Sequence, residues 1–215
     1  MSVAAVVPVY EAEPGLSALL EGLVAKFSPV VVVDDGSTKR VEADGVVLLR
    51  HETNRGKGAA IKTALRYLME RDEVTQVVFV DGDGQHRLED VVKVSEKSTR
   101  EDAAVFGVRK LLKPGVPFRS IWGNLWTALE VQILYGFRLT DTQTGLRAFP
   151  RRLFGALTEI RGERFEYEAR QFALLKRRGE KLLTEPIETV YIESNRASHF
   201  RPFRDTLLTQ YALFR

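Results

Sequence analysis

Cysteine is absent from the 215 residues of this chain. Without it neither a disulfide framework nor a thiolate metal site can form, and an intracellular location is the natural expectation. Long hydrophobic runs are also missing. The most apolar stretch, residues 120–137, carries Glu130 in its middle and several polar positions, so it does not predict a membrane-spanning helix. Any membrane contact is therefore expected to be peripheral.

Charge of one sign does not dominate either. The 32 basic residues nearly balance the 29 acidic ones, which leaves a net charge of +3 and predicts no nucleic-acid partner. The N-terminal stretch "MSVAAVVPVYEAEPG" has no basic region before its apolar residues, so it predicts a first strand and not a signal peptide. A hydrophobic content of 44% is ordinary for a globular protein, and the length predicts a single domain over residues 1–215.

Short β-branched runs alternate with helical patterns through the first half of the chain. The expected strands are Val3–Val9, Val30–Val33, Val46–Leu49, Val77–Val80 and Ala104–Val108. The expected helices are Leu16–Phe27, Ala59–Met69 and Leu88–Val94. Because the strands are nearly all apolar, we expect both of their faces to be covered. The order predicts an α/β fold with a mostly parallel central sheet flanked by helices and with ligands at the carboxyl ends of the strands.

Polar segments follow these strands: "PVYE", "DDGST", "NRGKG" and "DGDGQH". Taken alone, "DDGST" is typical of a tight turn. The segment "NRGKG" places Lys57 and free backbone N–H groups at a helix start, which suits a phosphate. It is not a Walker A loop, because Gly58 stands where Ser or Thr belongs and His51 where the first glycine belongs. A P-loop NTPase is therefore disfavoured.

The segment "VVFVDGDGQH" supplies hard oxygen ligands directly after an apolar strand. Asp81, Asp83 and Gln85 are the ligand types that Mg²⁺ or Mn²⁺ accepts when substrate phosphates complete its coordination. A calcium-binding EF-hand is excluded, because His86 occupies the place of the required glycine and Val92 that of the bidentate glutamate. The alternative to a metal site is an aspartate-rich turn that binds no ion.

Seven segments, in this order and spacing, resemble glycosyltransferase family 2, the inverting enzymes of the GT-A fold. They are "VPVYEAE", "VVVDDGST", "NRGKGAAIKTAL", "VDGDGQH", "DTQTGLRAF", "GERFEYE" and "ETVYIESNRASHFRPFRD". Within the family they look like the polyprenyl-phosphate sugar transferases typified by dolichol-phosphate mannose synthase. The resemblance implies a Rossmann-like nucleotide-sugar-binding half at residues 1–108. It also implies an acceptor half at residues 109–215 that ends in an amphipathic helix.

The resemblance assigns roles to single residues. It implies a metal site of Asp81, Asp83 and Gln85 that holds Mg²⁺ or Mn²⁺, and catalytic roles for Asp83, Asp141 and Arg147. It implies nucleotide-sugar contacts from Pro8, Tyr10, Glu11, Asp35, Lys57, Asp81, Arg196 and, as a second-tier candidate, His199. More ordinary alternatives remain open. Tyr10 could be a surface aromatic and Glu11 a helix-start charge; Arg147 and Arg196 could form surface ion pairs, and Asp141 could orient the acceptor, act as a base or form a turn.

The chemistry of sugar transfer explains these residue types. A divalent ion offsets the charge that develops on a diphosphate leaving group. A hydroxyl acceptor needs a general base, whereas a phosphate monoester with a second pKa near ~6 is already anionic at neutral pH. We therefore expect hexose transfer from a nucleotide-sugar of the GDP-mannose or UDP-glucose type to a polyprenyl or dolichyl phosphate. The alternatives are a saccharide or other hydroxyl acceptor with Asp141 as base, a non-catalytic sugar-nucleotide-binding subunit and, less favoured, a nucleotidyltransferase.

Cations and aromatic stripes in the second half fit an acceptor that is a membrane lipid. Guanidinium groups suit phosphate oxygens, and the candidates are Arg109, Arg119, Arg147, Arg196 and Arg201. Two helical stripes carry apolar residues: Trp122, Leu125, Trp126, Leu129 and Ile133, and then Phe203, Leu207, Leu208, Tyr211 and Phe214. Such stripes are mostly core faces, but with flanking arginines they also fit interfacial helices on anionic lipid. We expect a cytoplasmic protein, peripheral at the inner face of the membrane, with a separate membrane-protein partner as one way of holding it there.

Overall fold

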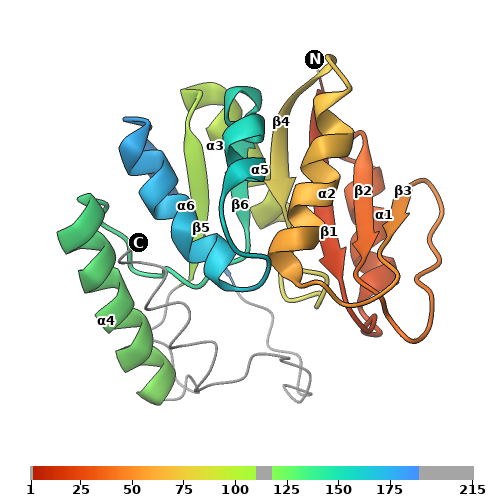
Figure 1. Cartoon of the computed structure of the whole chain (residues 1–215), viewed down its shortest axis with the longest axis horizontal. Helices are drawn as coiled ribbons and strands as arrows, with labels where there is room; N and C mark the ends of the chain where they lie inside the picture. Colours follow the sequence, from red (N-terminus) through yellow and green to blue (C-terminus); the bar gives the residue numbers. More distant parts are fainter. Residues whose placement is uncertain (1, 110–117, 189–215) are drawn as a thin grey trace.

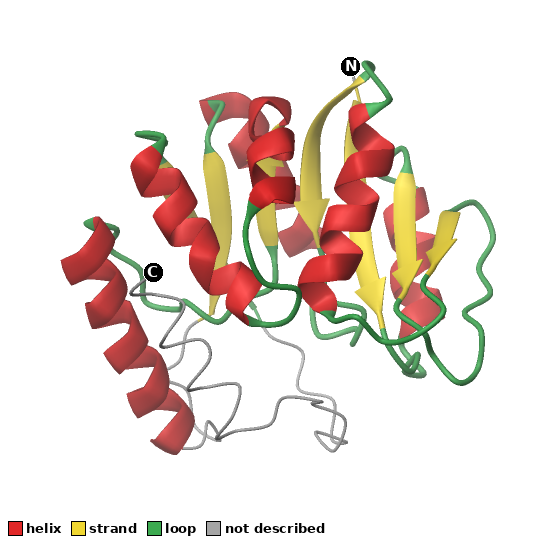
Figure 2. Ribbon diagram, viewed as in Figure 1, coloured by secondary structure: helices red, strands yellow, loops and turns green. Residues whose placement is uncertain are grey.

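The structure is a computed structural model of the chain. It describes residues 2–109 and 118–188, with the side chains of the helix that begins at Phe118 described from Asn124 onward. Within these residues one seven-stranded sheet has the order β3-β2-β1-β4-β6-β5-β7. Helices cover both of its faces (Figure 1, Figure 2). This arrangement confirms the α/β fold that the apolar runs predict.

The strands are β1 (Ser2–Val9), β2 (Val30–Asp34), β3 (Val47–Arg50), β4 (Val74–Phe79), β5 (Ala104–Arg109), β6 (Arg147–Pro150) and β7 (Leu182–Ile187). Neighbours β3, β2, β1 and β4 pair in parallel. Strand β6 is antiparallel to both of its neighbours, β4 and β5, and β5 pairs in parallel with β7. Because β6 comes from the second half of the chain and lies between two strands of the first half, both halves share one sheet. The division into functional halves at residue 108 stays a prediction.

The helices are α1 (Leu16–Val24), α2 (Lys57–Met69), α3 (Leu88–Glu101), α4 (Phe118–Tyr135), α5 (Phe154–Glu159) and α6 (Glu166–Arg177), with a 3₁₀ turn at Arg151–Leu153. Side chains of α2, α5 and α6 form one core with the sheet, and those of α1 and α3 form the other. Helix α3 runs beyond the expected end at Val94. Its later turns bury Ser95 and Ser98 in place of apolar residues, so the apolar pattern stops before the helix does.

Two expectations for the sheet need correction. Strand β3 was expected to be covered on both faces, but it is the outer strand, and Leu48 is 43% exposed while Val47 and Leu49 pack on the core. Strand β4 begins at Val74, earlier than the apolar run suggests. The strand includes buried Gln76, a polar residue that interrupts the apolar pattern by which the strand was predicted. Its side-chain amide donates to the Ser95 carbonyl of α3 over 2.8 Å, so its burial is compensated.

The carboxyl ends of β1, β2, β4 and β5 lie at one edge of the sheet, because these strands run in the same direction. The chain also reverses its order of strand addition here, since β2 lies on one side of β1 and β4 on the other. Such a switch point is where ligands bind in open α/β sheets. The expected C-terminal helix that carries Phe203 lies outside the described residues.

Candidate active site

The segment "DDGST" follows β2 and is held from within. Asp34 is fully buried and accepts hydrogen bonds from the backbone N–H groups of Ser37 (2.9 Å) and Val41 (3.3 Å) and from the Arg50 guanidinium. Burial alone would raise the pKa of Asp34, but the hydrogen bonds from Ser37 and Val41 and the charge of Arg50 lower it below its ordinary value. The carboxylate of the first aspartate of the pair is therefore held by protein donors, and it stabilises the turn.

Asp35 links this turn to the next polar loop. Its Oδ2 accepts from the N–H of Gly56 at 2.7 Å, and its Oδ1 accepts from the N–H of Arg55 at 3.0 Å. The same Oδ1 lies 2.6 Å from Nδ1 of His51, whose Nε2 is 2.9 Å from Thr63 Oγ1. Asp35 is thus buried with its carboxylate on protein donors. Asp35 therefore positions the loop "NRGKG". Its contact with the nucleotide stays a proposal.

Glu11 and Tyr10 follow β1, as the sequence predicts. Glu11 has a φ of 56°, which is uncommon for a residue other than glycine. Its backbone N–H donates to Ser37 Oγ at 2.9 Å, and its Oε1 accepts from the N–H and hydroxyl of Thr38 at 2.9 and 2.8 Å. The alternative of a helix-start charge is wrong, because α1 begins only at Leu16. Tyr10 is exposed beside it, and Pro8 lies within β1 opposite Val33.

Lys57 begins α2 directly after Gly56, whose φ of 108° favours glycine. Its Nζ lies 2.5 Å from Oδ1 of Asp81 and 2.9 Å from Oε1 of Glu168. Burial alone would lower the pKa of Lys57, but the charges of Asp81 and Glu168 raise it above its ordinary value. The side chain is therefore an ammonium ion shared by two carboxylates, one at the end of β4 and one on α6.

Asp81 and Asp83 follow β4 at the same edge. Burial alone would raise the pKa of Asp81, yet the charge of Lys57, with help from His86, lowers it well below its ordinary value. The pKa of Asp83 is raised, first by burial and then by the negative charge of Asp81. The Nε2 of His86 is 3.6 Å from Oδ2 of Asp81, and Gln85 meets Asp83 through its backbone N–H, which donates to Oδ1 over 3.0 Å.

The carboxylates of Asp81 and Asp83 fit Mg²⁺ or Mn²⁺ if other ligands complete the coordination. Two hard carboxylates that repel each other are suited to a divalent cation, which would relieve the repulsion. In the described part of the chain, no group of three or more His, Asp and Glu side chains is arranged as a ready-made metal site. Substrate phosphates and water usually complete the coordination of Mg²⁺, so two carboxylates suffice as the protein's part of such a site.

Gly145 of "DTQTG" lies against Asp81. A Cβ added at Gly145 would fall closer than 3.0 Å to Cγ and to both carboxylate oxygens of Asp81. No larger residue fits here without moving that carboxylate. The loop before β6 and the acidic loop after β4 are thus packed together, and the lack of a side chain at residue 145 leaves the room that Asp81 occupies.

Asp141 is fully buried and is ion-paired. Its Oδ2 accepts from Arg109 Nε at 2.6 Å, and its Oδ1 accepts from Arg109 Nη2 at 3.1 Å and from Asn124 Nδ2 at 2.8 Å. The N–H of Gln143 donates to the same Oδ1 at 3.1 Å. Burial alone would raise the pKa of Asp141, but the hydrogen bond and charge of Arg109 and the other donors lower it. The sequence left Asp141 open as a residue that orients the acceptor, a base or part of a turn. This environment disfavours the base, because it stabilises the charged carboxylate.

Arg147 requires a correction. Neither an acceptor contact nor a surface ion pair fits, because its side chain is 1% exposed. The guanidinium donates to the carbonyls of Thr142 (3.1 Å), Thr144 (2.9 Å) and Glu168 (2.7 Å), and to Oε1 of Gln171 at 2.6 Å. It joins the loop before β6 to α6. Arg147 thus stabilises the loops and helix around the site from within the core. Arg196 and His199 lie outside the described residues.

Three residues that the sequence did not single out complete these contacts. Glu168 holds Lys57, Asn124 holds Asp141, and His51 holds Asp35. Glu168 lies in the quoted segment "GERFEYE", but nothing in that segment shows which carboxylate reaches a lysine 111 residues away. Asn124 lies on the buried side of a helix whose sequence draws attention to its aromatic side.

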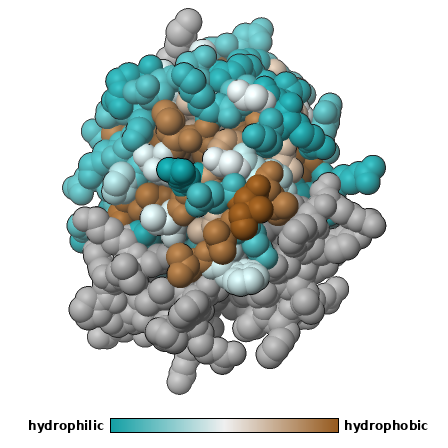
Figure 3. All heavy atoms as spheres, turned by 90° about the vertical axis from the view of Figure 1, so that its left-hand side faces the viewer, coloured by the Kyte–Doolittle hydropathy of each residue, from teal (hydrophilic) through white to brown (hydrophobic). Residues whose placement is uncertain are grey.

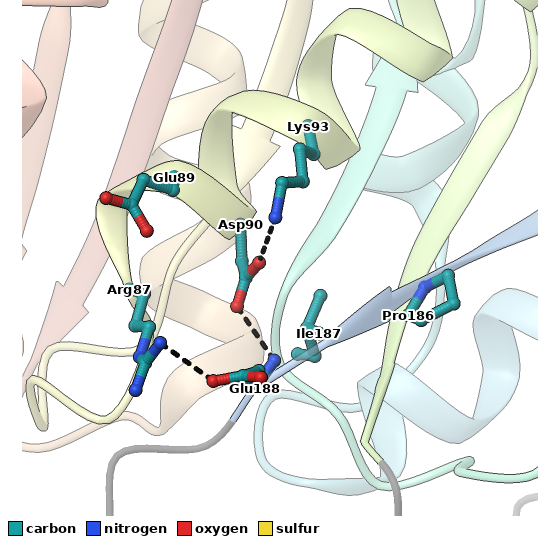
Figure 4. Close-up of a pocket in the computed structure, with 7 residues that line it drawn as sticks. All are labelled: Arg87, Glu89, Asp90, Lys93, Pro186, Ile187 and Glu188. Carbon is teal, nitrogen blue, oxygen red and sulfur yellow. Dashed lines mark hydrogen bonds and ion pairs between the residues drawn. The ribbon is translucent and has the colours of Figure 1, made fainter.

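A charged pocket of about 270 Å³ lies between the start of α3 and the end of β7 (Figure 4). Asp90 points between Lys93 Nζ, 3.1 Å away, and the backbone N–H of Glu188, 2.8 Å away. Arg87 pairs with Glu188 Oε2 at 2.7 Å. These contacts join the end of β7 to the helix that follows the acidic loop, and they pair both cations of the pocket with carboxylates.

Most of the chain is similar to known proteins. The pattern of the family described as "Glycosyl transferase family 2" matches residues 4–207. An uncharacterized protein of Methanocaldococcus jannaschii is 32% identical over 203 residues, which cover 87% of this chain and 81% of that protein. A UDP-N-acetylglucosamine–dolichyl-phosphate N-acetylglucosaminyltransferase of Methanococcus voltae is 26% identical over 219 residues, which cover 89% of this chain and 87% of the enzyme.

Solved structures show the same fold. Glucosyl-3-phosphoglycerate synthase of Mycobacterium tuberculosis, solved with Mn²⁺, UDP and phosphoglyceric acid, gives a TM-score of 0.67 at 19% identity over 99% of this chain and 76% of that one. Mannosyl-3-phosphoglycerate synthase of Rubrobacter xylanophilus gives 0.70 at 16% identity over 100% of this chain and 72% of that one. At these identities the likeness shows the fold alone. The chain therefore belongs to glycosyl transferase family 2: it is a glycosyltransferase with the GT-A fold.

Proposed function

We propose that the enzyme transfers a sugar from a nucleotide-sugar to a polyprenyl or dolichyl phosphate, with inversion at the anomeric carbon and with Mg²⁺ or Mn²⁺. The relative from Methanococcus voltae, named for dolichyl phosphate as acceptor, supports this acceptor class. Its name also adds UDP-N-acetylglucosamine to the hexose donors that the sequence suggests. The donor in this proposal is a hexose or N-acetylhexosamine joined to a nucleoside diphosphate.

The observation that carries the acceptor proposal is the environment of Asp141. A hydroxyl acceptor needs a base to take its proton, and Asp141 is the residue that the sequence offers for this task. In the structure its carboxylate is fully buried and is held by Arg109 and Asn124, and its pKa is lowered. Such a carboxylate takes up a proton poorly. A phosphate monoester brings its own negative oxygen, so it needs no base at this position.

The residues at the sheet edge have complementary tasks in this proposal. Asp81 and Asp83 would hold the divalent ion, which offsets the negative charge of the leaving diphosphate. Lys57 carries an ammonium beside Asp81, and in this proposal it would bind the same diphosphate. Pro8, Tyr10, Glu11 and Asp35 surround the nucleotide end in this scheme, with Arg196 and His199 as further proposed contacts. Glu11 and Asp35 act at least partly by fixing the loops beside the donor, since both bond to backbone N–H groups there.

Two aspartates have catalytic tasks in this proposal. Asp83 binds the ion, and Asp141 acts indirectly by orienting Arg109. Asp141 holds Nε and Nη2 of Arg109, at the end of β5, through two hydrogen bonds. This fixes the plane of a guanidinium that is still 29% exposed. Planar guanidinium groups bind phosphate oxygens. Arg109 is therefore the described cation that we propose for the acceptor phosphate, in place of Arg147.

The outer face of α4 supports contact with a membrane surface. Leu125, Trp126, Leu129 and Ile133 are 49% to 72% exposed, so they are not the core face that such stripes usually form. The opposite face of α4 buries Asn124, Thr127, Ala128 and Val131. Figure 3 shows apolar side chains gathered on this side of the molecule. Among the described residues, no helix is long and apolar enough to cross a bilayer.

A lipid acceptor would be reached from the membrane surface, so the outer face of α4 is proposed to rest on lipid at the headgroup level. The inner face of the membrane is the proposed location. A separate membrane-protein partner remains part of the same proposal.

The test is transfer of labelled sugar into an organic-extractable product. Purified enzyme is incubated with a C55 polyprenyl phosphate and, one at a time, with GDP-mannose, UDP-glucose and UDP-N-acetylglucosamine, with Mn²⁺ or with chelator. The expected result is label in the lipid phase for one donor and none with chelator. Label that enters only a soluble saccharide would support the hydroxyl acceptor. Donor binding without turnover under any of these conditions would support the non-catalytic subunit.

A further inference from the structure

Lys57 and Asp81 are in direct contact in the site where the divalent ion is proposed to bind. The Nζ–Oδ1 distance is 2.5 Å, and the Lys57 side chain is only 17% exposed. The other carboxylate oxygen of Asp81 has neighbours too, because Nε2 of His86 is 3.6 Å from Oδ2 and Gly145 packs on the carboxyl group. One oxygen of this proposed ligand is therefore taken by a cation that belongs to the protein.

An ammonium and a divalent ion on the same carboxylate would repel each other strongly at such separations, since little water lies between them to screen the charges. The Lys57 stem has four carbons with free rotation, so its head can move while its backbone stays in α2. Glu168 supplies the place to which it can move. Its Oε1 is already 2.9 Å from Nζ, and its side chain is 14% exposed on α6, a different element from the acidic loop.

We propose that Lys57 is an internal competitor of the divalent ion at Asp81, and that Glu168 is the positioning residue that keeps the ammonium when the ion displaces it. The inference rests on the proposed metal-dependent function and adds regulation to that site. In the ion-free protein Lys57 neutralises Asp81. When an ion binds Asp81 and Asp83, Lys57 withdraws to Glu168, from which it is free to meet the diphosphate of a donor.

This arrangement couples the ion to the donor. A donor diphosphate attracts both the ion and the released ammonium. Binding of the donor therefore raises the affinity for the ion, and by reciprocity binding of the ion raises the affinity for the donor. The ion-free site, by contrast, avoids two adjacent unneutralised carboxylates. The protein should therefore bind the metal weakly by itself and more tightly with the nucleotide.

The experiment measures Mn²⁺ binding and not sugar transfer. Mn²⁺ alone is titrated into the full chain, and free Mn²⁺ is followed by electron paramagnetic resonance. Four variants are compared with the parent protein: Lys57→Met, Glu168→Gln, Asp83→Asn, and the double variant Lys97→Met/Glu185→Gln. The last is the matched control, because Lys97 and Glu185 form a partly exposed ion pair at 3.0 Å between α3 and β7.

The competitor model predicts opposite signs for the two site variants. Lys57→Met should bind Mn²⁺ about tenfold more tightly than the parent protein, and Glu168→Gln several-fold more weakly, within the usual range of coupling between sites. The control pair should bind as the parent does. A variant that fails to fold would not bind more tightly, so a gain in Lys57→Met cannot come from damage to the fold.

Other outcomes overturn the inference at identifiable points. Mn²⁺ binding in Lys57→Met that is equal to or weaker than the parent's rejects Lys57 as a competitor. Unchanged or tighter binding in Glu168→Gln rejects Glu168 as its alternative partner. Binding that is indifferent to Asp83→Asn rejects the metal site and the inference with it. If the signs are as expected but no label enters polyprenyl phosphate, the proposed acceptor fails and the competitor stands.

Discussion

Substitution of Gly145 by alanine tests whether the carboxylate of Asp81 lies where the structure places it. The change adds one methyl group at a residue with no charge and no proposed contact with substrate. That methyl would fall closer than 3.0 Å to three atoms of the Asp81 carboxyl group. Carbon atoms do not approach so closely, so the carboxylate must move away from the loop before β6.

The expected effect follows from the size of that movement. A shift of roughly 1 Å in a group that positions substrate costs about 10²-fold in turnover. The shift also moves Asp81 relative to Lys57, now 2.5 Å away, and relative to the proposed ion. Strain from one extra methyl in a packed site costs about 1–3 kcal/mol in the free energy of unfolding. Gly145→Ala should therefore stay folded and lose most of its activity.

The assay combines sugar transfer at saturating donor and Mn²⁺ with thermal unfolding of the same preparation. Gly155→Ala is the matched control: it lies in α5, where an added Cβ would be 3.9 Å from Met69 Cε, an ordinary contact. The control should keep its activity and gain about 0.5–1 kcal/mol, because alanine is favoured over glycine in a helix. Full activity of Gly145→Ala would refute the placement of Asp81 against residue 145.

Three further predictions concern the acidic loop, the buried ion pair and α4. Asp83→Asn should abolish Mn²⁺-dependent transfer with little loss of fold, because the side chain lies in the loop between β4 and α3 and is not part of the core; normal activity would reject the metal assignment. Asp141→Asn should lower the free energy of unfolding at neutral pH by about 1–3 kcal/mol, since Arg109 loses a charged partner. The lowered pKa of Asp141 means that its stabilising effect is complete above the ordinary aspartate pKa and is lost as the pH falls through its lower folded value. Urea unfolding of both proteins from neutral pH into acid should therefore show the difference shrinking, and a constant difference would contradict the assignment. Ile133→Glu, at the most exposed apolar side chain of α4, should reduce flotation with anionic vesicles while transfer to a detergent-dispersed acceptor is kept; unchanged flotation would remove α4 as the docking face.

Local order along the chain was readable from residue patterns. Runs of β-branched residues such as Val30–Val33 bury both faces, so they predict central parallel strands without knowledge of their neighbours, and the structure confirms them. The acidic motif was equally readable, because aspartates that directly follow a buried strand must lie at its carboxyl end. The order of the apolar runs predicted the fold, and the resemblance of seven segments to a known family predicted the family.

The tertiary structure decided which side chains meet. Asp35, Asp141 and Arg147 look alike in sequence, as polar residues in motifs, yet the structure gives all three to protein partners. Their donors and acceptors come from other elements, such as Asn124 for Asp141 and the Glu168 carbonyl for Arg147. A local pattern carries no record of these distant partners.

The exposure of α4 and the contact of Glu168 with Lys57 were also decided by the tertiary structure. A helical stripe shows which side chains share a face, but only the packing of α4 through Asn124 and Val131 decides that the side of Leu125, Trp126, Leu129 and Ile133 is exposed. Likewise β6 enters antiparallel between β4 and β5, and α6 follows it to bring Glu168 to Lys57. Sequence determines the local periodicity and the chemistry of each strand end. Charge pairing and burial between residues more than 100 apart depend on how the whole sheet is assembled, and that was decided by the tertiary structure.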